Sequence, residues 1–139
     1  IKLIATKWIL YDADLVVIES DAAQKVWTKH LGRNTAVPVM AHAAGGKTDL
    51  ASGVPGLLLL LENRRWEFPY GEVGTYHRDE MDNMLAECEA FGWVDGKLQG
   101  VGEHDDTVMA FWHLNWGLDR LSNVTHVEQH RGVVEGARI

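Results

Sequence analysis

Hydrophobic residues recur along the chain at helical spacing in some segments and form short continuous runs in others. Near the start, Ile1, Ile4 and Trp8 recur every three or four positions, which is typical of one face of a helix. Residues 15–18 form a continuous aliphatic run bounded by acids, which favours a strand covered on both faces, as in parallel sheets. These patterns predict helices over 1–11, 22–31, 50 or 54 to 62, 75–91 and 105–121, and strands over 15–18, 36–41 and 66–68.

Glycine and proline divide these segments. Gly32 is predicted to stop the second helix, and Pro38 confines the strand over 36–41 to a sheet edge. Residues 94–103 are predicted to be a Gly-rich loop, and the tail over 122–139 shows no clear period. The alternation of helices and strands predicts an α/β fold with a small, partly parallel sheet flanked by helices.

The composition fits one domain in a soluble protein. The chain has 139 residues and a net charge of −7, so it lacks the basic surface that holds nucleic acid by charge alone. An acidic chain can still act on DNA if metal ions neutralise clustered carboxylates. The chain has no apolar run of the roughly 18–20 residues that span a bilayer, and its single cysteine, Cys88, suits a reducing cytoplasm. Because it opens without Met, directly in helix-like sequence, we expect a fragment of something longer.

Three acids stand at positions where chemistry is expected. Glu19 follows the strand over 15–18, and the carboxyl ends of strands are where open α/β sheets place ligand sites. The alternative is a loop acid or a helix cap. Asp105 and Asp106 begin the last helix, where they can cap free N–H groups or hold a divalent metal. The small Ala110, one turn from Asp106, would let this helix approach the sheet and bring an acid near Glu19.

The chemistry of such a cluster points to hard divalent cations. Clustered acids repel one another unless a cation joins them, and oxygen ligands suit Mg²⁺ or Mn²⁺. The seven histidines show no zinc spacing with cysteine, and Cys88 is interpreted as core rather than as a nucleophile. The six tryptophans are also interpreted as core. Lys47 follows Gly45 and Gly46 in a polar turn that could present it to a phosphate, with an exposed surface lysine as the alternative.

Three motifs together resemble the nuclease domain of tailed-bacteriophage terminase large subunits. Residues 17–24 (VIESDAAQ) look like its strand-plus-helix motif, and residues 104–110 (HDDTVMA) look like its final helix. The segments over 47–49, 53–57 and 61–69 look like its middle part. The resemblance covers about residues 1–121, which we expect to form a nuclease domain, followed by a C-terminal tail over 122–139.

The resemblance implies an RNase H-like three-layer fold and a hydrolase that cuts double-stranded viral DNA during genome packaging, using Mg²⁺ or Mn²⁺. It implies that Glu19 and the pair Asp105 and Asp106 bind metal. Of the pair, we favour Asp106, because it shares a helix face with Ala110. The expected partners are an ATPase domain, the portal and the small terminase subunit, in the cytoplasm of a bacterial host and without membrane contact.

The sequence departs from the family at one important point. The family's first metal-binding Asp lies on an opening strand, and no residue of this chain matches it, so the fold is expected to be incomplete and the enzymatic activity stays open. The alternative hypothesis is a non-catalytic remnant, such as a prophage relic, that keeps the fold and forms a homodimer through its incomplete sheet.

Overall fold

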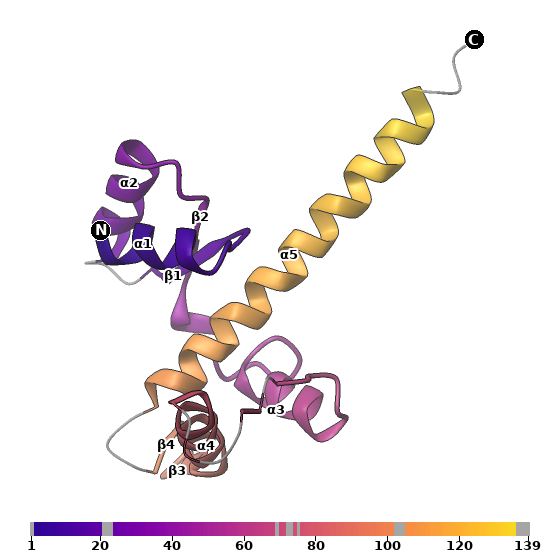
Figure 1. The fold of residues 1–139 in the computed structure, drawn as a ribbon. Helices are drawn as coiled ribbons and strands as arrows, with labels where there is room; N and C mark the ends of the chain where they lie inside the picture. The colour runs from indigo at the N-terminus through magenta and orange to yellow at the C-terminus, as the bar shows by residue number, and fades with distance from the viewer. Residues whose placement is uncertain are drawn as a thin grey trace. The chain divides into compact units, whose positions relative to one another are not determined.

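The computed structural model describes the backbone of residues 2–20, 24–68, 70, 71, 74, 76–101 and 105–135. It describes their side chains except those of 24, 25, 76, 77 and 123–135. The chain divides into two compact units (Figure 1). Unit 1 comprises residues 1–43 and 113–139, and unit 2 comprises residues 44–112. Asp21 and His104, which belong to the expected motifs, lie outside the described residues.

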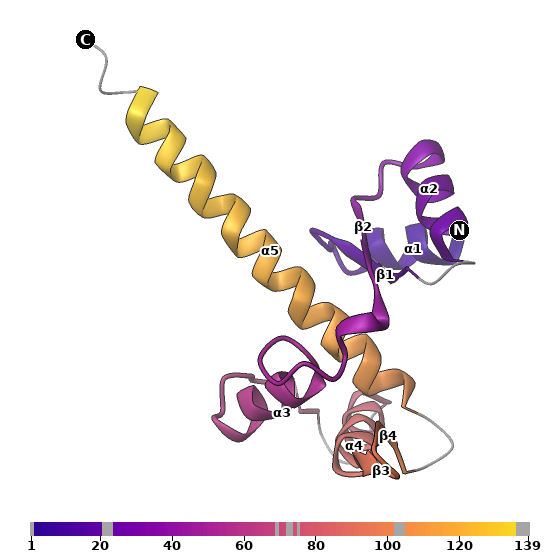
Figure 2. The same cartoon turned by 180° about the vertical axis from the view of Figure 1, so that it is seen from behind.

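Unit 1 is built on a parallel pair of four-residue strands. Val16 pairs with Val39 and Glu19 pairs with His42, and a helix connects the two strands (Figure 2). Leu31 on this helix is fully buried, as is expected of a crossover helix packed on its sheet. The elements of unit 1 are α1 (Lys2–Leu10), β1 (Val16–Glu19), α2 (Gln24–Asn34), β2 (Val39–His42) and the part of α5 (Asp106–Glu135) from His113 onward.

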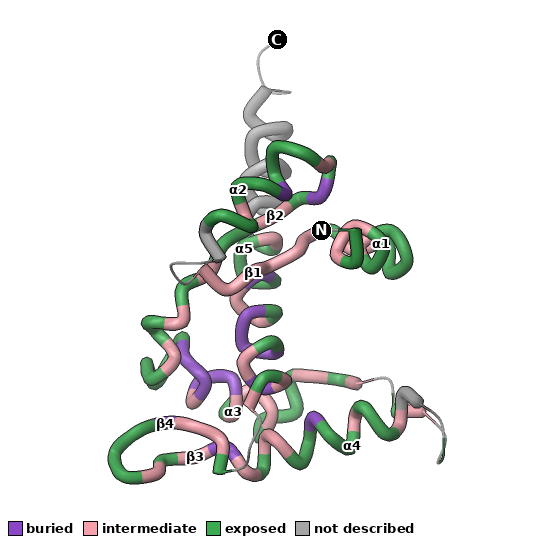
Figure 3. Tube along the Cα trace, turned by 90° about the vertical axis from the view of Figure 1, so that its left-hand side faces the viewer, coloured by how far each residue is buried: buried purple, intermediate pink, exposed green. Residues whose placement is uncertain are grey.

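Unit 2 packs two helices and a hairpin around the first turns of α5. Figure 3 shows buried segments in α3 and in α5. The indole N–H of Trp112, which is 1% exposed, donates to the carbonyl of Ser52 at 2.8 Å. The core residues are Val54, Leu57, Phe91, Leu98, Val108, Phe111 and Trp112. The elements are η1 (Ala44–Gly46), α3 (Val54–Glu62), α4 (Tyr76–Glu89), β3 (Phe91–Val94), β4 (Lys97–Gly100) and the start of α5.

Several predicted elements are confirmed, and the coarse α/β class is among them. The described residues form five α-helices and two small two-stranded sheets, of which one is parallel. Helix α3 begins at Val54, the later of its two predicted starts, and accommodates Pro55 in its first turn. No helix within the described ranges is both long and apolar enough to span a membrane.

Other predictions of elements are wrong. The stretch over 94–103 is not one loop, because β3 and β4 form an antiparallel hairpin around Asp95 and Gly96, both with positive φ. Helix α2 does not stop at Gly32 but continues to Asn34, and α5 does not end at 121 but continues to Glu135. The segment over 66–68 forms no strand.

Candidate functional site

Glu19 ends β1 at the carboxyl edge of the parallel pair, as predicted. Its register partner is His42, the last residue of β2, so a carboxylate and an imidazole stand at the same edge. Both side chains are half-buried. Ligands of α/β sheets usually bind at this edge. Glu19 offers carboxylate oxygens there and His42 offers ring nitrogens, and both kinds of atom can bind a ligand.

His42 belongs to an aromatic cluster with α5 that the sequence did not predict. Its Nδ1 lies 2.8 Å from Nδ1 of His113, and its ring stacks on Trp116 with centroids 4.2 Å apart. The guanidinium of Arg120 covers the same indole at 3.6 Å. Burial, with smaller contributions from His113 and Arg120, lowers the pKa of His42 from 6.5 to about 4. The imidazole is therefore neutral at pH 7.

A glycine brings α5 close to this sheet. A Cβ placed on Gly117 would lie 2.6 Å from Cγ2 of Val17 on β1, closer than side-chain atoms approach. The expectation that Ala110 lets this helix approach the sheet stays a prediction, because Ala110 belongs to unit 2 and the sheet to unit 1. The small residue that allows the contact lies two turns further along the helix.

Asp105 and Asp106 begin α5 in unit 2, as predicted. Asp105 directly precedes the helix, and its carbonyl accepts the N–H of Met109 at 3.0 Å. The carboxylate of Asp105 is half-buried and that of Asp106 is exposed. Among the described residues, neither carboxylate has a hydrogen bond or an ion pair.

The side-chain cap of α5 comes from Glu87 on α4 instead. Its two oxygens accept the backbone N–H of Thr107 at 2.8 Å and the Thr107 hydroxyl at 2.9 Å. An N-cap aspartate ordinarily accepts a backbone N–H at this point of the first turn. Because Glu87 accepts it here, the acid pair is not engaged as a side-chain cap. The sequence analysis did not identify Glu87, because Glu87 and Thr107 are 20 residues apart and no sequence pattern predicts a contact between them.

Lys47 lies in a turn that is held by backbone hydrogen bonds. Its N–H donates to the carbonyl of Ala44 at 3.2 Å, and its own carbonyl accepts from Val54 at 2.9 Å. Asp49 closes the following turn by accepting from the N–H and hydroxyl of Ser52 and from the N–H of Ala51, and these bonds lower the pKa of Asp49. The Lys47 side chain is half-buried.

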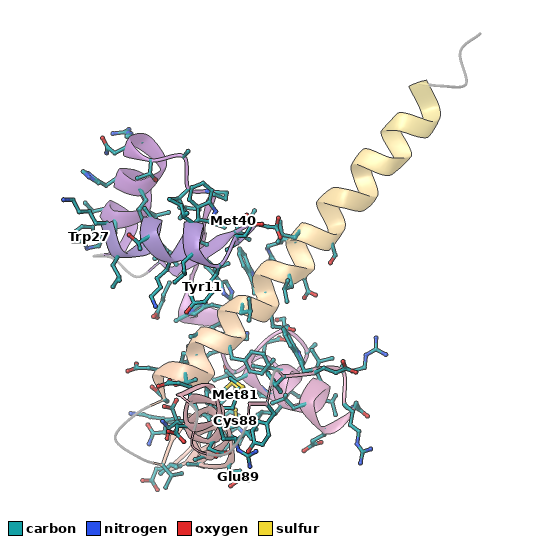
Figure 4. All side chains as sticks on the ribbon, viewed as in Figure 1. Tyr11, Trp27, Met40, Met81, Cys88 and Glu89 are labelled. Atoms are coloured by element: carbon teal, nitrogen blue, oxygen red, sulfur yellow. The ribbon has the colours of Figure 1, made fainter. Side chains whose placement is uncertain are left out.

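Cys88 behaves as the sequence predicts. It is half-buried against the core of unit 2, and Figure 4 shows it on α4 with Met81. Burial, reinforced by Glu87 and Glu89, raises the pKa of the Cys88 thiol, so it stays protonated at neutral pH. A protonated thiol is a poor nucleophile.

The predicted site residues fall in different units. Unit 1 brings Glu19 together with His42, whereas unit 2 holds Asp105, Asp106 and Lys47. Within the described residues, no three His, Cys, Asp or Glu side chains are grouped so that they could hold a metal ion. Metal binding by the three acids stays a prediction. No family model, curated protein or solved structure matches the chain.

Proposed function

We propose that this chain is a metal-dependent endonuclease domain of the terminase large-subunit type, with an RNase H-like fold, which cuts double-stranded viral DNA. The motif resemblance supports the proposal, and one structural observation carries it. Glu87 accepts the N–H of Thr107 at the start of α5, and among the described residues neither the carboxylate of Asp105 nor that of Asp106 accepts a hydrogen bond there. An acid pair without a capping role leaves its oxygens available to a cation.

The proposed metal ligands are Glu19 and Asp106, with Asp105 as the second acid of the pair. Glu19 stands at the carboxyl end of β1, and Asp106 is exposed at the first turn of α5. Carboxylate oxygens are the donors that Mg²⁺ and Mn²⁺ prefer, so the residue types fit these ions. When bound, such an ion supplies Lewis acidity to the phosphodiester and to its attacking water.

The proposed role of Lys47 is to contact a phosphate of the substrate. Its neighbouring backbone is fixed by hydrogen bonds, so the ammonium group is presented from a defined turn. The proposed partners are those of the family, namely an ATPase domain, the portal and the small terminase subunit. The proposed place of action is the cytoplasm of a bacterial host.

Metal-dependent thermal stability tests the ligand assignment. An ion that binds only the folded protein, present at about 100 times its Kd, stabilises the fold by about 2.7 kcal/mol. For a domain of this size we expect Mn²⁺ to raise Tm on the order of 8 °C. Asp106→Ala should abolish this rise, and Asp119→Ala, at an exposed position of the same helix, should retain it. An undiminished rise in Asp106→Ala would overturn the assignment.

A non-catalytic, dimeric remnant is the second candidate. One observation favours it: β1 and β2 form a sheet of only two strands among the described residues, and so small a sheet is marginal without further cover. Size-exclusion chromatography together with a plasmid-nicking assay in Mn²⁺ separates the two candidates. A clean dimer without nicking favours the remnant, and a nicking monomer favours the nuclease.

A further inference from the structure

Helix α2 concentrates positive charge in a chain that is acidic overall. Acids outnumber Lys and Arg by 20 to 13 in the whole chain. Helix α2 nevertheless contains no acid, and it carries Lys25, Lys29 and Arg33 at successive four-residue intervals. Helix α4, by contrast, is rich in acids. The net charge led us to expect no basic surface for nucleic acid, and α2 is a local exception, because such segregation of charge creates a positive field on a negative molecule.

The outer face of α2 is hollowed. A groove of about 290 Å³ lies along it, lined by Val26, Lys29, His30, Arg33 and Asn34, and we call this the α2 groove. All five side chains are exposed. Leu31, which is 0% exposed, marks the opposite face of the helix that packs into unit 1.

The cations of the α2 groove lack acidic partners in the described part of the chain. Lys29 and Arg33 are one helical turn apart, where like charges repel and weaken the helix. The only salt bridge found among the described residues joins Arg78 and Asp82 in unit 2. An anion held between Lys29 and Arg33 would remove this repulsion.

We propose that the α2 groove binds the phosphate backbone of double-stranded DNA. The inference rests on the proposed function, which makes duplex DNA the substrate. Lys29 and Arg33 are separated by about 6 Å along the helix axis. Each strand of a duplex presents one phosphate for every ~3.4 Å of the duplex axis, so two cations at this separation can contact phosphates of the same strand. This contact is independent of base sequence.

The neighbouring side chains suit a duplex better than a single strand. Trp27, which is 55% exposed, projects from α2 (Figure 4), contrary to its predicted place in the core. It lies beside the α2 groove rather than in it. The imidazole of His30 is the one aromatic ring among the five lining residues, so the groove lacks the series of rings on which successive bases of a single strand stack.

DNA binding in EDTA tests the α2 groove without cleavage. The affinity of the full chain for a fluorescent 20-base-pair duplex is measured by anisotropy between 20 and 150 mM NaCl, and the slope of log K against log salt is compared among variants. Lys29→Gln and Arg33→Gln should each reduce the slope by about 1, equally on duplexes of two unrelated sequences. Lys97→Gln, an exposed lysine on β4, is the matched control and should keep the wild-type slope.

Every result of this binding assay either supports or overturns DNA binding by the α2 groove. Unchanged slopes in both α2 variants, an equal reduction in Lys97→Gln, or no duplex binding by the wild type at 20 mM salt would overturn it. Because the assay contains EDTA, it does not depend on metal chemistry. If duplex binding behaves as expected but Mn²⁺ yields no nicking, the α2 groove stands and the nuclease proposal fails.

Discussion

The carboxylate of Glu87 accepts two hydrogen bonds from Thr107 and so ties α4 to the first turn of α5. A residue outside the helix thus satisfies a donor that the acid at the helix start would ordinarily satisfy. The acid pair was interpreted either as a helix cap or as a metal ligand, and the hydrogen bonds of Glu87 favour the second interpretation. The contribution of Glu87 as a cap can be measured as a change in the free energy of unfolding.

Replacing Glu87 should weaken unit 2. We expect Glu87→Ala to lower the free energy of unfolding by about 1–2 kcal/mol, because it removes a charged cap and leaves a backbone N–H of α5 without its acceptor. Urea unfolding measures the change. Glu89→Ala, exposed on the same helix, should stay within about 0.5 kcal/mol of wild type. A larger loss from Asp105→Ala than from Glu87→Ala would mean that Asp105 is the cap after all.

Gly117 should tolerate no larger residue. Gly117→Ala places a methyl group against Val17, and we expect a loss of about 1–3 kcal/mol despite the better helix propensity of alanine. Gly32→Ala in α2 is the matched control, since nothing lies within 4 Å of the added Cβ, and it should stabilise by about 0.4–1 kcal/mol. The double variant Val17→Ala/Gly117→Ala should lose less than the sum of its single changes. Strict additivity would contradict the contact.

Local patterns predicted most helices but few of the contacts between elements. The helical spacing near the start, the aliphatic run of β1 and the position of Pro55 depend on neighbouring residues alone, and the structure confirms them. The contact of His42 with His113 joins residues 71 apart, and no periodicity encodes it. The capping of α5 by Glu87 could not be predicted either, because Glu87 and Thr107 are also far apart in the sequence.

The missed hairpin did have a local signal. Asp95 and Gly96 both take positive φ, of 49° and 76°, which is the two-residue turn that Asp-Gly favours. The adjacent glycines made the whole stretch resemble a loop. Trp66 and Phe68 alternate like a strand, but their rings pack on Phe111 with centroids 4.7 and 5.5 Å away, and this packing, rather than strand pairing, explains the pattern.

The turn at Gly96 provides a further test. Gly96→Ala should lower stability by about 1–2 kcal/mol, because an L-residue with a Cβ is strained at positive φ. Gly92→Ala in β3 has open space around its Cβ and an ordinary φ, so it should have a much smaller effect. Thermal unfolding of both variants gives the comparison, and equal losses would argue against the hairpin.

His42 should make stability depend on pH. Its folded pKa of about 4 lies below its unfolded value of 6.5, so the unfolded chain binds more protons between these values. The contribution of the neutral His42 ring to the free energy of unfolding is therefore fully present above pH 6.5 and is lost as the pH falls toward 4. NMR titration should give His42 a midpoint near 4, and His42→Gln should flatten the fall in urea midpoint, unlike His30→Gln at an exposed position. A His42 midpoint near 6.5 would contradict the burial of its ring.

Nicking of supercoiled plasmid in Mn²⁺ tests the central proposal most directly. Wild-type protein and Asp119→Asn should convert supercoiled DNA to open circles, while Asp106→Asn and Glu19→Gln should each reduce the rate at least a hundredfold, the scale of losing a group that stabilises the transition state. All four proteins should be inactive in EDTA. Equal nicking by Asp106→Asn and wild type, or no nicking by wild-type protein, would contradict the proposal.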